Sequence, residues 1–229
     1  SLWSGLVGEV DFQPREEVYL ALDMATTTDL CALSMLSKNG KALRTFFWKP
    51  DDLLEEHGRR DRVDYALWQR QGWLEPCRGK TIKPEYVAAK VAWVYSTYRV
   101  VGLAYDRWRI EYLKNEFARI DLDASEDEDA QIRLVPWGQG YKDMAPAIDA
   151  FEEAAINGAF VHENNPLLNW NVANAIVDMD AAGNRKLDKE KSRLRIDGAV
   201  SSTMAFGLRA RDAEENAPSV YRTRGVRSI

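Results

Sequence analysis

The chain has 229 residues, of which 45% are hydrophobic, and it carries a formal net charge of −5. A chain of this length can bury a substantial core, and 8 Trp, 9 Tyr and 7 Phe exclude a disordered protein. No apolar run approaches the roughly 20 residues of a membrane span, and no secretory signal opens the chain. We therefore expect a cytosolic protein without membrane partners. With only two cysteines and two histidines, a disulfide framework is disfavoured and a His-rich zinc site is excluded.

The first informative segment follows a lead-in. Residues 1–16 contain Gly and Pro but little periodicity, and Ser1 in place of an initiating Met indicates a piece of a longer protein. Val18–Asp23 is an almost wholly apolar run, typical of a strand that is covered on both faces. Alternation places Asp23 on the face of Tyr19 and Ala21, at the end of that strand. Asp23 therefore either simply ends a buried strand or belongs to a functional site.

Two further strands are expected to form an antiparallel meander with the first. Residues 26–29 read as a turn, and the strands Leu30–Leu36 and Leu43–Trp48 then flank Asn39 and Gly40, a strong hairpin signal. A helical stretch begins after Pro50 and is expected to continue over Arg62–Gln71. Beyond a loop, apolar residues at helical spacing predict an amphipathic helix over Pro84–Tyr98.

That helix leads directly into a second apolar run that ends in a carboxylate, Val100–Asp106. A strand, a crossover helix and a strand predict parallel pairing with a right-handed connection. Asp106 shares its face with Ala104, as Asp23 does with Ala21. If the two strands are neighbours their carboxylates converge, and like charges held close are costly unless a cation sits between them.

The remaining elements are shorter or less certain in type. We expect Asp197 in the first turn of a late helix whose apolar residues are spaced four apart, with small neighbours that allow close packing on a sheet. Asn169–Val177 reads as a short helix or a strand, and residues 212–229 as a flexible tail. The other expected elements are a helix Trp108–Phe117, a strand Ile132–Pro136, a helix Met144–Asn157, a hairpin turn Ala181–Asn184 and the late helix Ile196–Leu208.

Charge is distributed unevenly. Residues 121–129 carry six acids and no bases, whereas 185–195 carry six bases against two acids. The acidic run reads as a solvated loop. The basic run reads as a hairpin that grips a nucleic-acid backbone or, alternatively, as a solvated surface. Lys191 and Arg195 are the preferred DNA-binding pair, because they lie close to Asp197. If that pair fails, the contacts are to be sought at Arg59, Arg60 and Arg62.

Three aspartates thus fall on three kinds of element. An aspartate in a first helical turn is common for helix-dipole reasons, and each residue alone has an ordinary structural explanation. Together, Asp23 on a meander strand, Asp106 on a parallel strand reached by a crossover and Asp197 on a late helix indicate the ribonuclease H-like fold. We therefore predict an α/β protein with a mixed sheet, an antiparallel three-strand meander followed by parallel strands, and flanking helices. The domain is expected to span residues 17–211.

The segments around the three aspartates resemble those of a known family. The segments Leu20–Asp23, Gly102–Asp106 and the run from Asn171 through Lys191 to Gly198 are similar to the nuclease domain of tailed-phage large terminase subunits. The resemblance covers roughly residues 17–211 in the right order, and the C-terminal run is its most specific part. It implies a metal-dependent endonuclease that cuts concatemeric viral DNA during genome packaging.

The resemblance also implies that Asp23, Asp106 and Asp197 are catalytic metal ligands. Three carboxylates suit two Mg²⁺ or Mn²⁺ ions, which can activate water and stabilise the leaving oxygen of a phosphodiester. We expect Asp23 to bridge the ions, and Asp106 and Asp197 to hold one each. Asp178 and Asp180 are candidate auxiliary acids, although carboxylates on a hairpin are more often solvated.

The resemblance also has implications for the partners of the protein, and other functions are compatible with the same aspartates. The resemblance implies double-stranded DNA as substrate and, in the full-length protein, an ATPase motor domain, a portal ring and a small terminase subunit, in the cytoplasm of an infected bacterium. The isolated domain is expected to be monomeric. The chain contains no G-x-x-x-x-G-K-[ST] loop. Alternatives are a junction resolvase of the same fold, a DNA-binding scaffold without activity, or an actin-like phosphotransferase lobe, although Met24 and Ala25 replace the glycine that such a phosphate loop uses after its Asp.

Overall fold

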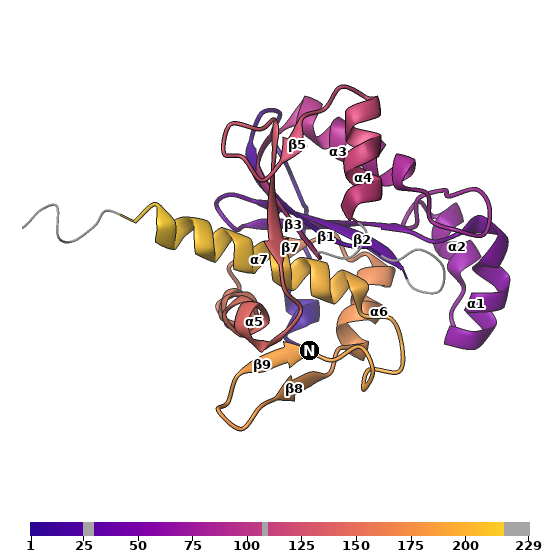
Figure 1. Cartoon of the computed structure of the whole chain (residues 1–229). Coiled ribbons are helices and arrows are strands. Elements are labelled where there is room, and N and C mark those ends of the chain that lie inside the picture. The colour runs from indigo at the N-terminus through magenta and orange to yellow at the C-terminus, as the bar shows by residue number, and fades with distance from the viewer. Residues whose placement is uncertain (25–29, 107–109, 218–229) are drawn as a thin grey trace, which may run out of the picture.

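A mixed β-sheet with helices on both faces organises the chain (Figure 1). The structure, a computed structural model, describes residues 1–24, 30–106 and 110–217. Within those ranges, seven strands pair in the order β5-β6-β4-β1-β2-β3-β7. The strands are β1 Glu17–Asp23, β2 Cys31–Ser37, β3 Ala42–Trp48, β4 Arg99–Asp106, β5 Ala124–Ser125, β6 Ile132–Trp137 and β7 Val161–His162. The predicted fold class is confirmed.

The pairing follows the predicted connectivity. β1, β2 and β3 form an antiparallel meander, and β4 lies parallel to β1 on its other side. β6 continues the sheet parallel to β4. β5 and β7 were not predicted, and β5 falls within the acidic run 121–129 that was expected to be a loop. Each pairs over two residues, β5 with β6 and β7 with the far edge of β3, and two residues are too few for alternation to be visible in the sequence. The predicted turn 26–29 lies outside the described residues.

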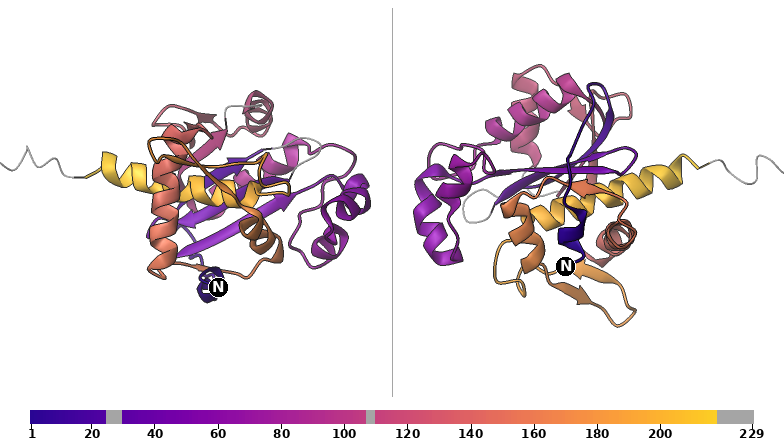
Figure 2. Two further views of the ribbon diagram at one scale, coloured as in Figure 1. Left: turned by 90° about the horizontal axis from the view of Figure 1, so that it is seen from below. Right: turned by 180° about the vertical axis from the view of Figure 1, so that it is seen from behind.

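Helices cover the sheet in two layers, which Figure 2 shows from below and from behind. One core cluster joins the sheet to α3 and α4, and a second joins it to α5, α6 and α7. A small hairpin of β8 and β9 is separate from the main sheet. The helices are η1 Trp3–Leu6, η2 Asp51–Leu53, α1 Leu54–Asp61, α2 Tyr65–Arg70, α3 Pro84–Thr97, α4 Ile110–Arg119, α5 Tyr141–Ile156, α6 Pro166–Asn174 and α7 Asp197–Glu215; the hairpin strands are β8 Val177–Met179 and β9 Arg185–Leu187.

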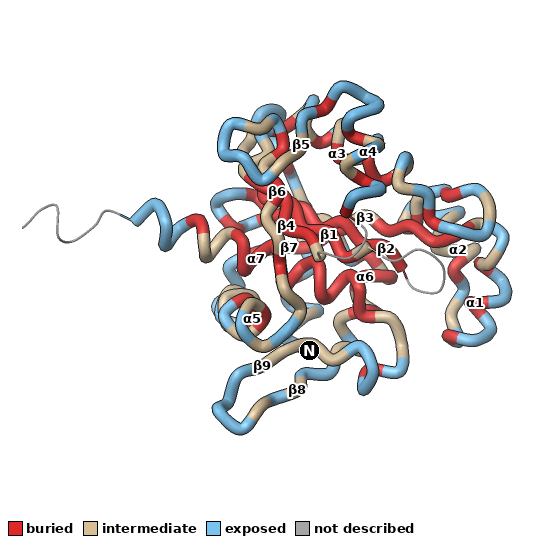
Figure 3. Tube along the Cα trace, in the orientation of Figure 1, coloured by how far each residue is buried: buried red, intermediate tan, exposed pale blue. Residues whose placement is uncertain are grey.

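β1 lies at the centre of both cores (Figure 3). Leu20 and Leu22 pack with α3 and α4, while Tyr19 and Ala21 face the layer that contains α7. Both faces of the strand are covered, which accounts for its nearly continuous apolar sequence. Because side chains alternate, Asp23 at the end of the strand points to the α7 face.

Small residues let α7 approach that face closely. Gly198, Ala199, Ser201, Ser202 and Ala205 are all buried. The Ser34 hydroxyl of β2 hydrogen-bonds with the hydroxyls of Ser201 and Ser202, at 2.8 and 3.0 Å. These bonds satisfy polar groups that would otherwise be costly to bury. The first residue of α7, Asp197, is thereby held against the end of the sheet.

Two predicted helices have different limits. The stretch expected to continue over Arg62–Gln71 is interrupted, because Arg62 adopts a left-handed conformation with φ 59° that ends α1. The helix expected to end at Leu208 continues to Glu215. Its polar last turns are held by contacts with the sheet. Asp212 accepts a hydrogen bond from the Tyr19 hydroxyl of β1, and the Arg211 guanidinium lies 3.9 Å from the centroid of the Trp137 ring of β6.

The segment between α6 and α7 agrees with the prediction in part. The expected turn joins β8 to β9, and Asn169–Val177 divides between the end of α6 and the start of β8. Of the basic run, only Arg185–Leu187 is strand; residues 188–196 form turns and irregular chain, so alternation does not sort their side chains. Residues 108–109 of the expected helix and 218–229 of the expected tail lie outside the described residues.

The segment before β1 packs on the domain. The Trp3 ring stacks on His162 with centroids 4.0 Å apart, and its indole N–H donates to the Asn169 side chain at 2.8 Å. Leu6 is buried beside them. The domain limits proposed at residues 17 and 211 stay a prediction. Cys31 and Cys77 are buried free thiols. None of the described helices is long and apolar enough to cross a membrane.

Candidate metal centre

Two of the three predicted aspartates end neighbouring strands. In the parallel β1 and β4 pair, Leu22 lies opposite Tyr105, and Asp23 and Asp106 each follow one residue later. Parallel strands in register direct such side chains to the same face of the sheet, the face covered by α7. Asp23 is 2% exposed, whereas Asp106 lines a cavity of about 640 Å³.

The third aspartate, Asp197, reaches the same place from α7 and is also 2% exposed. The start of α7 is fixed by α6, because the Asn171 side chain accepts a hydrogen bond from the Gly198 backbone N–H at 2.8 Å. Gly198 is also pressed against the sheet, since a Cβ at that position would lie 2.5 Å from Cζ of Phe47. Asp197 is thus positioned by a close backbone approach that only glycine allows.

A lysine that the sequence analysis did not single out joins two of these carboxylates. Lys189 Nζ lies 2.7 Å from Asp23 Oδ2 and 3.0 Å from Asp197 Oδ1. Lys189 belongs to the basic run, but no periodicity distinguishes it from its five basic neighbours. Burial acts to lower the pKa of Lys189, but the charges of Asp23 and Asp197 outweigh that effect and raise it.

The environment of Asp23 is costly for a charge. Burial raises its pKa to about 6, and Asp197 adds to the rise while Lys189 opposes it. The Gln139 side chain donates to Asp23 Oδ1 at 3.2 Å. Asp23 Oδ2 is buried and accepts no hydrogen bond of normal geometry from the described residues. One oxygen of Asp23 is therefore oriented by Gln139, and the other faces only the Lys189 charge.

These groups fit a hard divalent cation. Carboxylate oxygens are the ligands that Mg²⁺ and Mn²⁺ prefer. The Lys189 ammonium already lies as a cation between the Asp23 and Asp197 carboxylates. Within the described ranges, no cluster of three or more His, Cys, Asp or Glu side chains is arranged as a metal-binding group. In this structure the Lys189 ammonium joins Asp23 and Asp197, and Asp106 lies at the end of the strand next to β1.

A second charged cluster, formed by the end of α1 and the segment before α7, lies beside this centre. Asp61 accepts hydrogen bonds from the Arg60 guanidinium at 2.7 and 3.1 Å and from the Tyr65 hydroxyl at 2.8 Å. Arg195 Nε lies 3.5 Å from the same carboxylate. Lys49 is fully buried, with Nζ 4.8 Å from the centroid of the Tyr65 ring, and burial lowers its pKa to about 8. Asp61 is therefore the shared anion of several cations.

We expect Asp61→Ala to lower the free energy of unfolding by about 3–5 kcal/mol at pH 7, because it leaves partly buried cations without their anion. Asp61 is 4% exposed. Burial acts to raise its pKa, but hydrogen bonds from Arg60 and Tyr65 outweigh that effect and hold it low. The stabilisation is thus complete above the unfolded pKa of about 3.9 and is lost as the pH falls through the folded pKa. Urea unfolding at several pH values measures it.

The matched control for that variant is Glu55→Ala, an exposed glutamate on the same helix. Its loss should change the free energy of unfolding by less than about 0.5 kcal/mol, the usual range for exposed sites. An Asp61→Ala variant as stable as this control would show that the cluster does not hold α1 to the segment before α7.

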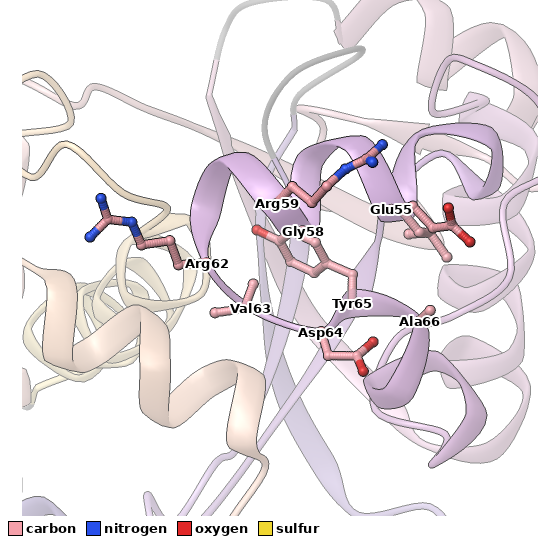
Figure 4. Close-up of a pocket in the computed structure, with 9 residues that line it drawn as sticks. Glu55, Gly58, Arg59, Arg62, Val63, Asp64, Tyr65 and Ala66 are labelled. Carbon is pink, nitrogen blue, oxygen red and sulfur yellow. The ribbon is translucent and has the colours of Figure 1, made fainter.

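The residues predicted to bind DNA already have acidic partners. Lys191 is exposed, forms an ion pair with Asp178, and lies 3.8 Å from Asp188. Arg195 is half-buried beside Asp61. By contrast, Arg59 and Arg62 are exposed, have no ion pair within the described chain, and line a cavity of about 510 Å³ beside α1 and α2. Figure 4 shows their guanidinium groups pointing in different directions.

The two candidate auxiliary acids, Asp178 and Asp180, lie in β8 and in the turn that follows it. Asp178 accepts hydrogen bonds from the Tyr141 hydroxyl, at 2.6 Å, and from Lys191. Asp180 accepts from the backbone N–H groups of Ala182 and Asn184, at 2.9 and 2.8 Å, and so fastens the β8–β9 turn. Asp180 thus has local partners in the hairpin, whereas Asp178 is held by Tyr141 of α5 and by Lys191, which follows β9.

Comparison with known proteins identifies relatives of the whole domain. Residues 5–214 match the model of the family described as "Terminase large subunit, endonuclease domain". The terminase large subunit of Enterobacteria phage HK97 is 37% identical over 210 residues, which are 90% of this chain and 40% of that protein. The chain therefore spans less than half the length of this curated relative.

Solved structures agree with this match. The crystal structure of the HK97 bacteriophage large terminase has a TM-score of 0.80 at 36% identity, over 90% of this chain and 42% of that one. The large terminase nuclease from thermophilic phage G20c, crystallised with bound magnesium, has a TM-score of 0.51 at 12% identity, over 90% of this chain and 96% of that one. The second likeness shows a shared fold.

Proposed function

Because this chain belongs to the family of endonuclease domains of the terminase large subunit, we propose that it cuts concatemeric viral DNA during genome packaging by metal-dependent hydrolysis of phosphodiester bonds. One observation carries the proposal. Two buried carboxylates from different elements, Asp23 and Asp197, bracket a single cationic atom at the end of the central strand. A pair of buried like charges is costly unless a cation balances it, so this place is built to hold positive charge.

The proposed chemistry uses two divalent ions. Bound Mg²⁺ or Mn²⁺ ions would supply an activated water and stabilise the leaving oxygen. Asp23 would hold both ions, and Asp106 and Asp197 one each. Magnesium bound to the G20c nuclease supports the choice of a divalent metal. Gln139 orients the Asp23 carboxylate, and Asn171 fixes the helix that carries Asp197.

The experiment that tests this function is incubation of supercoiled plasmid with the chain and Mg²⁺ or Mn²⁺. We expect nicked and linear products that disappear when a chelator is added. Because the sequence contains no nucleotide-binding loop, addition of ATP should leave the rate unchanged. Intact plasmid with both metals, or cleavage that persists in chelator, would contradict the proposal.

The assembly around this domain is part of the proposal. By its family, the full-length protein would join this domain to an ATPase motor and work with a portal ring and a small terminase subunit, in the cytoplasm of the infected bacterium. Double-stranded DNA would be the substrate, and the isolated domain would be monomeric.

For the DNA contacts, we expect replacement of both Lys191 and Arg195 with Ala to weaken duplex binding across sequences. If each side chain neutralises one phosphate, the slope of log affinity against log salt should flatten by about 1.8. Titration of a duplex at several salt concentrations, with Ca²⁺ in place of the catalytic metal, measures the slope.

The comparison variant for this titration replaces Arg59 and Arg62, which have no ion pair within the described chain. If this double variant flattens the slope and the first does not, the duplex lies over α1 and α2. The Lys191 and Arg195 assignment would then be wrong, and their ion pairs with Asp178 and Asp61 would be purely structural.

A further inference from the structure

Lys189 occupies the oxygens that a metal ion would need. Its Nζ contacts Asp23 Oδ2 and Asp197 Oδ1, and each carboxylate is almost fully buried. An ammonium at 2.7 and 3.0 Å and a divalent ion bound to the same two oxygens would lie close together, and their like charges would repel each other strongly in this buried place. Lys189 and the metal are therefore alternatives at this place.

We propose that Lys189 is a built-in competitor of the catalytic metal, which neutralises the carboxylates until a divalent ion displaces it. This inference rests on the proposed function, because it concerns the regulation of the same site. Without Lys189, the metal-free protein would hold two buried negative charges close together. With it, the site stays assembled, and the metal binds only by replacing an ion pair.

The segment around Lys189 is fixed independently of that ion pair. The Asp188 side chain accepts hydrogen bonds from the backbone N–H groups of Glu190 and Lys191, at 2.9 and 3.0 Å. The Ser192 hydroxyl donates to the Asp188 carbonyl at 2.6 Å and accepts from the Ile176 N–H at 3.2 Å. The backbone on both sides of Lys189 is thus held by its own hydrogen bonds. Displacement of the ammonium from the carboxylates therefore requires rotation of the Lys189 side chain alone.

That side chain has a way out of the site. The Lys189 side chain is 37% exposed, although its ammonium reaches two buried carboxylates. A long aliphatic stem of this kind can turn its charged end into water at little cost. The next lysine, Lys191, already pairs with Asp178 and Asp188 and so does not take over the place that Lys189 leaves.

The test is the affinity of the full chain for Mn²⁺ alone, measured by calorimetry without DNA. We expect Lys189→Met to bind Mn²⁺ at least 10-fold more tightly than the unaltered protein, because methionine keeps the stem and removes the charge. The matched control is Lys186→Met. In the unaltered protein the Lys186 ammonium lies 5.1 Å from the centroid of the Tyr141 ring, so its loss should leave the Mn²⁺ affinity unchanged. Unchanged or weaker binding by a folded Lys189→Met protein would overturn the proposal.

A second measurement uses the unaltered protein and does not depend on how the variant folds. Acetylation of lysines by a soluble reagent, followed by mass spectrometry, should modify Lys189 at least several-fold faster with saturating Mn²⁺ than with chelator. Equal rates would contradict displacement. Both readouts are separate from DNA cleavage. If Lys189→Met binds Mn²⁺ more tightly but the unaltered protein has no nuclease activity, the role of Lys189 as a competitor stands and the proposed function is wrong.

Discussion

We expect Asp23→Asn to lower metal-dependent DNA cleavage by more than about 10²-fold, beyond the loss usual for residues that only support a metal ligand. The amide keeps the size of the side chain and the hydrogen bond with Gln139, but it removes the charge that faces the cation. Asp106→Asn and Asp197→Asn should have similar effects. Plasmid cleavage at fixed metal concentration measures the loss, and thermal unfolding verifies the fold.

The control for Asp23→Asn is Asp129→Asn, the same chemical change at an exposed position of the acidic loop. It should leave the cleavage rate unchanged. Near-normal, metal-dependent cleavage by Asp23→Asn would remove Asp23 from the metal site and, with it, the reason for placing catalysis at the end of β1.

The second large effect is expected from Gly198→Ala. The added Cβ would lie 2.5 Å from Cζ of Phe47 and 3.2 Å from Cδ1 of Leu168, so either the start of α7 or the Phe47 ring must shift. The Phe47 ring is itself fully buried, and we therefore expect the start of α7 to move. Overpacking of this kind typically lowers the free energy of unfolding by about 1–3 kcal/mol. Because Asp197 precedes Gly198, the shift should also move a proposed metal ligand, and a displacement of about 1 Å can cost 10²-fold in rate.

Gly5→Ala is the control for this change, because no atom lies within 4 Å of the Cβ position. Urea unfolding and plasmid cleavage are measured on both variants. If Gly198→Ala proves as stable and as active as Gly5→Ala, then Phe47 yields easily and the close approach of α7 does not position Asp197.

The central strands and the places of the three aspartates in the fold, at the ends of β1 and β4 and at the start of α7, could be predicted because their signals are local. An apolar run that ends in Asp identifies β1 and β4, and the crossover helix fixes their parallel pairing. The small residues after Asp197 likewise indicate a helix packed closely on a sheet. The resemblance to terminase nucleases, confirmed by the family match, rests on these same segments.

The parts that could not be predicted depend on contacts between distant residues. Nothing near Lys189 in the sequence shows that Asp23, 166 positions earlier, lies beside it. The break at Arg62 depends on a left-handed backbone conformation that arginine rarely adopts. The last turns of α7 are polar, and only the folded partners Tyr19 and Trp137 explain why they are ordered. Tertiary contacts thus decided the place of Lys189 and the length of α7, whereas a local left-handed cap decided the end of α1.

The most direct test of the metal centre is an anomalous difference map from crystals of the full chain soaked in Mn²⁺. We expect a manganese peak in direct coordination with Asp23 and Asp197, close to Asp106, with the Lys189 ammonium withdrawn from both carboxylates. A manganese peak remote from these carboxylates, in protein that cuts plasmid at the same Mn²⁺ concentration, would contradict it.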